Sequence, residues 1–533
     1  MVDILIKNGQ IVDGSGAPAY AADLAVKDGK IVQIGPDLDL EAAEILDAAG
    51  KQVVPGFIES HTHSDSIVFT GSDSYNFIEQ GVTSQIAGNC GSSPTPYYPE
   101  SQIKEKGNLT EEEFQARKEM AKSPATFMAA AEKQCYGTNL ALFAGHSPIR
   151  GHAMAYRAGR ANAEEMADMK AMLEEAMQAG FLGMSTGLVY APSVYADTEE
   201  LIELSSVMSK YNGIYVSHIR GEGDNVMRSL KEAIRIGEES GCRTHISHLK
   251  VMGKHNEGRS PELLKEIDAA NARGLIVNAD QYPYNASSAP LHSQIPPKYL
   301  IGGVPALLER IRDPKIRKEI LWSIFHETDE FESGVYYSGF DGALITGSDK
   351  APEFVNKTLA QIAAERGIEP IDALCEVLLA NNGYAQGCYF NQNAVDLLYI
   401  MKHPRVFCGA DSSDRRVKAD REKVGGTHPR GTATTLRRIE IVRDFRLRTM
   451  EESIKNLTFD TAQAFGLANI GLLKEGWNAD ITVLEYDKVH ARADYVHPYR
   501  KGDGISDVIV NGQMAVRGGE FLGTRAGKVM KRG

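Results

Sequence analysis

The sequence contains no apolar run long enough to cross a membrane and no recognisable secretory signal. Lys7 and Asn8 interrupt the first apolar residues, and no basic segment precedes them, whereas a signal peptide needs a basic start followed by an unbroken apolar region. A bilayer-spanning helix needs about 20 mostly apolar residues in a row. We therefore expect a cytoplasmic protein.

Cysteines are few and far apart. The six are Cys90, Cys135, Cys242, Cys375, Cys388 and Cys408. In a long chain without a secretory signal, this spacing indicates reduced thiols and argues against a disulfide framework.

Positive charge is also scarce, because the formal net charge is −13 at pH 7. A nucleic-acid partner requires a basic face, so we expect no nucleic-acid partner, and we expect no membrane partner. An anionic small-molecule substrate is compatible with this charge, since a few buried Arg or Lys residues can dominate a pocket. The 533 residues suffice for one large catalytic domain and a smaller one.

Short alternating segments joined by Gly-containing turns occupy the first fifty residues and recur near the other end of the chain. Examples of the turns are Asp13-Gly14 and Asp28-Gly29, and examples of the later strands are 479–484 and 507–512. This pattern is typical of a small antiparallel sheet. We predict one small β-sandwich domain formed by residues 1–54 and 468–533.

The middle of the chain, residues 55–467, has a different pattern. Eight short apolar runs each end in a polar cluster, and helical patterns such as 163–177 lie between most of them. The runs are 53–61, 82–90, 140–146, 181–186, 214–218, 244–248, 275–280 and 406–411. Alternating strands and helices form a parallel sheet with right-handed crossovers, and eight repeats close it into a barrel. The predicted fold class is α/β, a (β/α)8 TIM-type barrel.

More than a hundred residues separate the seventh and eighth predicted strands. We predict an inserted subdomain there, at about 288–350. Long insertions after barrel strands often cover the active site; the alternative is a solvated decoration.

Metal-binding side chains end five of the eight predicted strands, where the chemistry of such a barrel lies. They are His61, His63, Cys90, His218, His248 and Asp411. Alternate residues of a strand point the same way, so both histidines of the first pair can face one metal. Taken singly, each has a plainer interpretation: a capping histidine, a buried structural cysteine or a satisfied core residue. Taken together, they indicate a metal site.

Two further histidines lie near predicted strand ends. His146 ends the third strand, and we predict that it contacts the metal ligands or the substrate. His245 comes three residues before His248, so strand alternation points it away from the site, and we expect it to pack in the core.

These residues resemble the amidohydrolase superfamily, whose signature is His-x-His after the first strand followed by later His, His and Asp. Within that superfamily the chain is similar to the D-aminoacylase (N-acyl-D-amino-acid deacylase) family over nearly its whole length. The matching motifs are PGFIESHTHSD at 55–65, GNCGSSP at 88–94, MSTGLVYAP at 184–192, SHIR at 217–220, SHLK at 247–250, YPY at 282–284 and HPR at 428–430.

The resemblance implies a tight zinc on Cys90, His218 and His248. It implies a second, weaker site on His61, His63 and Asp411. Many binuclear amidohydrolases bridge their metals with a carboxylated lysine that ends strand four. The corresponding run at 181–190 has no lysine, and the thiolate of Cys90 can be the anionic ligand instead.

The expected mechanism starts with zinc, which activates a water molecule and polarises the amide carbonyl. Asp411 takes the proton from that water and later donates it to the leaving amine. By resemblance, the α-carboxylate of the substrate is held by Arg430, Tyr282 and Ser288. Arginine can bind a carboxylate through two hydrogen bonds, although a surface ion pair is the alternative for Arg430.

Other residues could share the binding of substrate. The charged loop 414–423 could displace Arg430 or replace it with Arg415 or Arg416. Lys250 follows a predicted ligand by two residues and could face the site. Tyr190 lines the pocket or packs in the core.

The resemblance therefore implies an enzyme that hydrolyses N-acyl-D-amino acids to a D-amino acid and a carboxylate. The D preference comes from the resemblance alone. The alternatives are a cyclic amide hydrolase of the dihydroorotase or hydantoinase kind, against which the missing lysine counts, and a non-catalytic scaffold, against which the full ligand set counts. Relatives divide among neutral, D-glutamate and D-aspartate substrates, and we favour neutral, apolar side chains.

Overall fold

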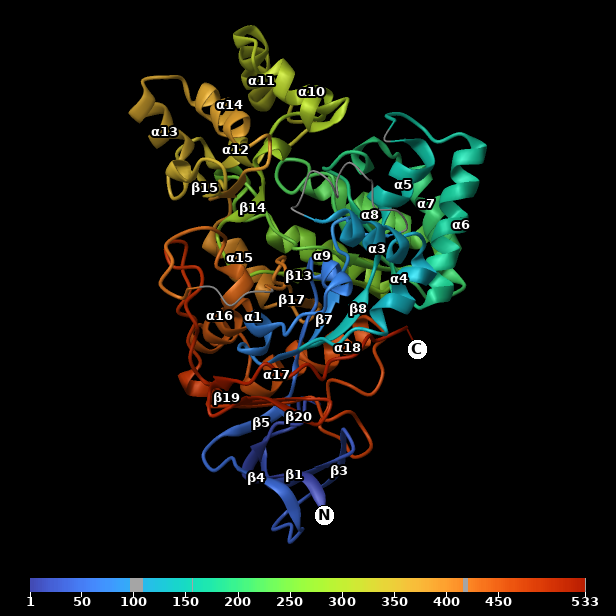
Figure 1. Cartoon of the computed structure of the whole chain (residues 1–533), viewed down its shortest axis with the longest axis vertical. Coiled ribbons are helices and arrows are strands. Elements are labelled where there is room, and N and C mark those ends of the chain that lie inside the picture. The colour runs from blue at the N-terminus through green and yellow to red at the C-terminus, as the bar shows by residue number, and fades with distance from the viewer. Residues whose placement is uncertain (96–108, 156, 416–419, 533) are drawn as a thin grey trace.

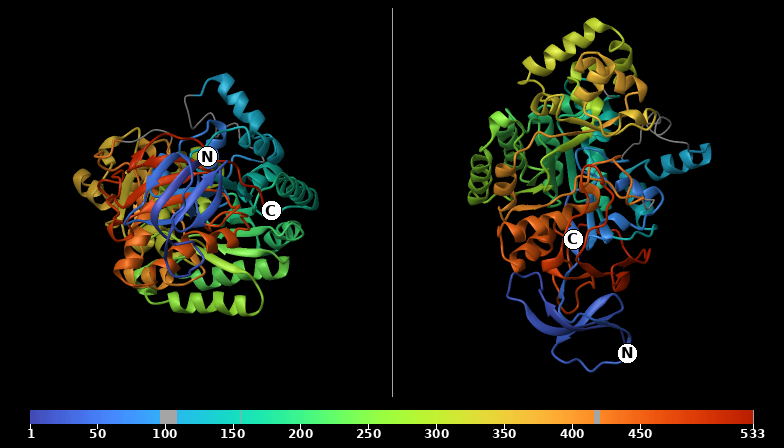
Figure 2. Two further views of the ribbon diagram at one scale, coloured as in Figure 1. Left: turned by 90° about the horizontal axis from the view of Figure 1, so that it is seen from below. Right: turned by 90° about the vertical axis from the view of Figure 1, so that its left-hand side faces the viewer.

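The computed structural model describes residues 1–95, 109–155, 157–415 and 420–532 (Figure 1). Three parts follow one another along its longest axis: a sheet made from both chain ends, a central layer of parallel strands and helices, and an inserted segment at the opposite end (Figure 2). None of the described helices has both the length and the apolar character that a membrane span requires.

Strands from the two ends of the chain pair in one nine-stranded sheet. Its members are β1 (Val2–Ile11), β2 (Tyr20–Lys27), β3 (Lys30–Gly35), β4 (Ala42–Asp47), β5 (Gln52–Pro55), β18 (Ile481–Leu484), β19 (Ile505–Val510), β20 (Gln513–Arg517) and β21 (Glu520–Phe521). The order is β21-β20-β19-β18-β5-β1-β2-β3, with β4 also paired to β1. The antiparallel pairing of β5 with β18 joins the N-terminal strands to the C-terminal ones.

The central layer has a strand at each of the eight predicted places. They are β6 (Phe57–Glu59), β7 (Val82–Ala87), β8 (Asn139–Leu142) with its continuation β9 (Ala144–Gly145), β10 (Gly183–Gly187), β11 (Ile214–His218), β12 (Arg243–Ile246), β13 (Val277–Gln281) and β17 (Val406–Cys408). All neighbours are parallel, in the orders β6-β7-β8 and β9-β10-β11-β12-β13-β17. Backbone hydrogen bonds also link β6 to β17, since Ser60 N donates to Cys408 O over 3.0 Å. The α/β class is therefore confirmed.

Helices follow these strands along the chain, and the last three of them, α16 to α18, come after β17. They are α1 (Tyr75–Ile78), α3 (Glu111–Met120), α4 (Pro124–Ala131), α5 (His146–Met154), α6 (Ala163–Ala179), α7 (Thr198–Ser209), α8 (Val226–Ser240), α9 (Ser260–Ala272), α15 (Ala394–Met401), α16 (Arg430–Asp444), α17 (Met450–Leu457) and α18 (Phe459–Ala464). Helix α6 shows why they form: Asn162 caps its first turn in a capping box with Glu165, and Met169, Leu173 and Met177 bury one face.

The inserted segment, which lies between β13 and α15, builds its own small sheet and core. The sheet runs β14 (Ser287–Pro290), β16 (Gln386–Tyr389), β15 (Ala343–Gly347). The helices are α10 (Gly303–Arg310), α11 (Pro314–His326), α12 (Gly334–Ser338), α13 (Leu359–Arg366) and α14 (Pro370–Ala380). The segment extends beyond the predicted range of about 288–350, because β16 pairs with both β14 and β15.

Candidate metal centre

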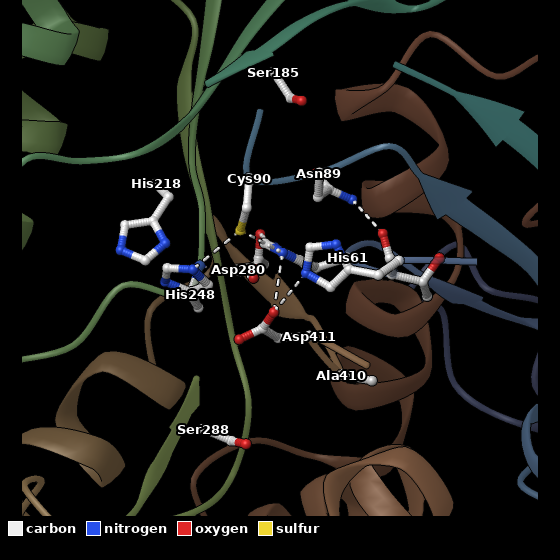
Figure 3. A network of polar contacts seen from close by, with 12 residues as sticks. His61, Asn89, Cys90, Ser185, His218, His248, Asp280, Ser288, Ala410 and Asp411 are labelled. Carbon is white, nitrogen blue, oxygen red and sulfur yellow. Dashed lines mark hydrogen bonds and ion pairs between the residues drawn. The ribbon is translucent and has the colours of Figure 1, made fainter. Parts of the chain in front are cut away.

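The candidate metal ligands come from five strands and meet where those strands end. His61 and His63 follow β6, Cys90 follows β7, and Asp411 follows β17. His218 is the last residue of β11, and His248 follows β12. Because the strands are parallel, their C-terminal ends lie on one side of the sheet. The side chains of His61, Cys90, His218, His248 and Asp411 point toward one another there (Figure 3).

The ligand atoms form two groups that share the thiol of Cys90. One group is His61, His63, Cys90 and Asp411, and the other is Cys90, His218 and His248; within each, the atoms lie within 4.8 Å of one another. The Cys90 sulfur is 3.4 Å from Nε2 of His61 and 3.4 Å from Nε2 of His248. The thiol therefore lies between the two groups, as a ligand common to two metals would.

Three of the six candidate ligands have a strained backbone. Cys90, His248 and Asp411 have φ angles of 52°, 36° and 46°, in the left-handed region that side chains other than glycine seldom adopt. Each such residue costs about 1–3 kcal/mol, and such strain clusters at functional sites. In each case the chain turns sharply just after the strand, where its side chain joins the ligand group.

The ionisation of the groups suits a cation. Burial would raise the pKa of the Cys90 thiol, but the neighbouring His61 and His248 rings lower it well below its usual value. Burial would likewise raise the pKa of Asp411, but Arg430 and His248 lower it well below its usual value. Nδ1 of His218 is buried without a hydrogen-bond partner among the described residues. A thiolate, a carboxylate and an unpaired imidazole nitrogen fit a metal ion.

Asp280 orients the candidate ligand His61 by contacting its Nδ1 atom. Its Oδ2 lies 3.1 Å from Nδ1 of His61 and 2.8 Å from Nε2 of His245, and its Oδ1 accepts the backbone N–H of His248. A hydrogen on Nδ1 of His61 leaves the lone pair of Nε2 for a metal. Asp280 ends the seventh predicted run, but no pattern in the sequence predicts its contact with His61. His245 packs against the Phe407 and Phe465 rings.

Glu222 orients a second ligand, and sequence reasoning missed it. Its Oε1 lies 2.8 Å from Nδ1 of His248 and 2.5 Å from Nζ of Lys250. Lys250 Nζ is also 2.7 Å from the same Nδ1. If Lys250 donated to Nδ1, the neutral ring would carry its hydrogen on Nε2, which could then bind no metal. A hydrogen bond from Nδ1 to Glu222 keeps the Nε2 lone pair free.

Two cations and a tyrosine lie beside the ligand groups. The Arg430 guanidinium is 2.8 Å from Oδ2 of Asp411 and 4.9 Å from the Tyr282 ring centre. Lys250 Nζ is 5.5 Å from the same ring centre. Nη2 of Arg430 also donates to the carbonyl oxygen of Ser288. Arg430 is buried, so the alternative of a surface ion pair is wrong.

A cavity of about 1340 Å³ opens from this site toward the inserted segment. Lys250, Tyr282, Ser288 and Arg430 all line it. Tyr190 lines it as well, with its ring 5.2 Å from the His218 ring. The inserted segment contributes both apolar or aromatic side chains and polar ones to the lining. The former include Leu300, Ile301, Val304, Phe331, Tyr384 and Tyr389, and the latter include Gln294, Glu332 and Gln386.

Two other predicted residues have different surroundings. His146 is buried between Ser193 and Glu200, at 2.8 Å and 3.1 Å, and it is not among the residues that line the cavity. The prediction that it contacts the metal ligands or the substrate is therefore not supported by any described contact. Arg415 lines the cavity with its guanidinium over the Tyr499 ring, and Arg416 lies outside the described residues.

The chain is similar to known amidohydrolases. Residues 44–274 match the model of the Amidohydrolase family. The chain is 32% identical to D-aminoacylase from Alcaligenes xylosoxydans xylosoxydans over 99% of this chain and 98% of that protein. It is 30% identical to the N-acyl-D-aspartate deacylase of the same organism, over 100% and 95%.

A solved structure is also similar to this chain over its whole length. N-acyl-D-glutamate deacylase from Bordetella bronchiseptica, complexed with zinc and a phosphonate inhibitor that mimics the tetrahedral intermediate of the reaction, superposes with a TM-score of 0.80. The identity is 30%, and the match covers 99% of each chain.

Proposed function

The chain belongs to the D-aminoacylase family of amidohydrolases, and we propose that it is a zinc-dependent enzyme that hydrolyses N-acyl-D-amino acids to a D-amino acid and a carboxylate. The observation that carries the proposal is the pair of ligand groups sharing Cys90, beside a buried Arg430 that can receive a carboxylate. A metal site next to a buried cation suits an amide substrate that bears a carboxylate.

We also propose a barrel and a division into two domains. The eight central strands close into a (β/α)8 barrel, with β6 beside β17. Residues 1–54 and 468–533 form a small β-sandwich domain, residues 55–467 form the catalytic domain, and the inserted segment belongs to the latter. Three hydrogen-bonded links support closure: Ser60 N to Cys408 O, Asp411 N to His61 O, and His63 N to Ser412 O.

The tight zinc site uses Cys90, His218 and His248, because one thiolate and two imidazoles are a preferred zinc donor set. The weaker site uses His61, His63 and Asp411. When bound, zinc supplies the Lewis acidity that activates water and polarises the amide carbonyl. Oδ1 of Asp411 is 2.9 Å from Nε2 of His63 and 3.5 Å from Nε2 of His61, so it lies against the site where that water would react.

Asp411 is the general base and then the general acid. The neighbouring Arg430 and His248 keep its carboxylate ionised despite burial, so it can accept a proton from water and later donate it to the nitrogen of the leaving amine. Arg430 therefore has two functions. It stabilises the ionised carboxylate of Asp411, and it reaches the cavity where the substrate lies.

The α-carboxylate of the substrate binds beside Arg430, Tyr282 and Ser288, with Lys250 close enough to add a second positive charge. Tyr190 lines the same pocket beside His218. The side chain of the substrate extends into the cavity beneath the inserted segment. Because that wall offers an apolar and aromatic surface at Leu300, Ile301, Val304 and Phe331, we propose neutral, apolar side chains as the preferred substrates.

A substrate panel tests the function. N-acetyl-D-methionine should release free amine in the presence of zinc, and N-acetyl-L-methionine should not. The D-glutamate and D-aspartate derivatives should react more slowly than the D-methionine and D-leucine derivatives. Faster turnover of a hydantoin or of dihydroorotate would favour the cyclic amide alternative. A pure protein that holds no zinc would favour the scaffold.

A further inference from the structure

The loop after β11 carries Glu222, the carboxylate that faces Nδ1 of His248. This loop, residues 219–225, has no regular structure of its own before α8 begins at Val226. A side chain on such a loop holds its position only if the backbone beneath it is held. Met252 N–H donates to the Glu222 carbonyl oxygen over 2.8 Å, and Arg259 donates to the Gly223 carbonyl oxygen over 3.2 Å. The inserted segment binds the N–H groups on the other side of the same backbone.

Glu332, from the inserted segment, binds the loop backbone directly. Its Oε2 accepts the N–H groups of Glu222 and Gly223, at 2.7 Å and 2.9 Å, and its Oε1 accepts the N–H of Asn225 at 2.6 Å. A carboxylate that receives several amides of one loop binds as an anion does in a backbone nest. Only 7% of Glu332 is exposed, so water competes little for these hydrogen bonds.

The sequence of the loop fits this contact. A Cβ atom on Gly221 would lie 2.9 Å from the Glu332 carboxyl group, and one on Gly223 would lie 2.2 Å from the Tyr337 ring. Glycine at both positions therefore lets the inserted segment approach the loop. Tyr337 adds a further bond, since its hydroxyl oxygen accepts the N–H of Asp224 at 2.9 Å.

We propose that Glu332 is a positioning residue of the metal centre, acting through Glu222. By holding the backbone of residues 222–225, it keeps the Glu222 carboxylate where it receives the Nδ1 hydrogen of His248. Nε2 of His248 then faces the metal with its lone pair. The inserted segment thereby contributes to metal binding although it contains none of the six candidate metal ligands. This proposal rests on the metal site of the proposed function.

Zinc release provides the first test. Glu332→Gln replaces one acceptor oxygen by a donor and so breaks part of the contact, and Glu332→Ala removes it. The exposed Glu330→Gln, two residues away, is the matched control. Loss of groups that orient metal ligands typically lowers metal affinity about 10–100-fold. We expect E332Q and E332A to lose zinc to a chelator at least about tenfold faster than the wild type, and E330Q to match it.

A double-mutant cycle separates positioning from general stability. If Glu332 acts through Glu222, E332Q should accelerate zinc release in the wild type but change it by less than about twofold in an E222A background. Cobalt(II) replacing zinc should show shifted absorption bands in E332Q and unshifted bands in E330Q. Wild-type zinc release in E332Q, or equal acceleration in both backgrounds, would overturn the proposal.

Failure of the Glu332 proposal can be distinguished from failure of the proposed enzymatic activity. Zinc release and the cobalt spectrum require no substrate, so a wild-type protein that binds zinc tightly but hydrolyses no N-acyl-D-amino acid refutes only the activity. If E332A does not fold, E332Q carries the test. If E222A does not fold, E222Q takes its place in the cycle.

Discussion

Arg430 gives the sharpest test of the site, because it is assigned two effects that one substitution should remove together. Its guanidinium lies 2.8 Å from Asp411, is buried, and faces the cavity. Arg430→Gln keeps the length and polarity of the side chain but removes the charge. The substitution should weaken binding of the α-carboxylate, and it should alter the ionisation of Asp411.

The expected loss of activity in R430Q follows from the contacts of Arg430. A hydrogen bond to a charged group contributes about 1.5–3 kcal/mol, so loss of the arginine–carboxylate pair should lower kcat/KM for N-acetyl-D-methionine by one to two orders of magnitude, mainly through KM. The cation also holds the pKa of Asp411 down. Without it that pKa rises toward its usual value. Because the base works only when ionised, activity is then lost at a higher pH as the solution is acidified.

The assay is release of free amine from about pH 5 to about pH 9, which yields kcat and KM across the profile. Arg437→Gln is the control, because Arg437 lies on the same helix but donates to the Pro283 carbonyl and does not line the cavity. The reasoning fails if R430Q retains the wild-type KM and the wild-type acidic limb. It also fails if R437Q shows the same changes.

Three further predictions follow from other residues. Asp411→Asn should lower kcat at least about a hundredfold while zinc in the tight site is retained, as activity and elemental analysis would show; near-normal turnover would exclude Asp411 as the base. Cys90→Ala should lose bound zinc from purified protein, whereas the exposed Cys135→Ala should retain it. Burial raises the pKa of Asp480 from 3.8 to about 6, so the folded protein holds this proton more tightly than the unfolded chain does. The resulting stabilisation of the folded state, about 3 kcal/mol, is present below about pH 4 and is lost as the pH rises through about 6. The melting temperature of Asp480→Asn relative to wild type should therefore increase between about pH 4.5 and about pH 7.5, and a difference that does not change with pH would contradict the assignment.

The candidate ligands could be predicted from the sequence because each of them has a local signal. His61 and His63 alternate at the end of an apolar run, and Cys90, His218 and His248 each close another run. The rule that parallel strands present their C-terminal ends together then brings them to one place. The left-handed backbone at Cys90 and Asp411 has no such signal, since neither position is a glycine.

The supporting carboxylates could not be predicted in the same way. Glu222 lies four residues after His218, but its contact with His248 depends on the course of a loop. Glu332 is separated from that loop by about a hundred residues, and nothing in its own segment marks it as a partner of backbone amides. Asp280 ended a predicted run, so its neighbourhood was predictable, but its role as acceptor for His61 required the observed geometry.

The pairing of β5 with β18 has a consequence for synthesis of the chain. Residues 52–55 leave the ribosome more than 400 residues before residues 481–484, their antiparallel partners. At typical elongation rates of 5–20 residues per second, that interval is roughly 20 to 90 seconds. Throughout it, the edge of β5 that β18 will cover has no native partner, and an unpaired strand edge is a place where chains associate wrongly. Premature termination before β18 should therefore yield an insoluble product, even though every candidate metal ligand has already been made.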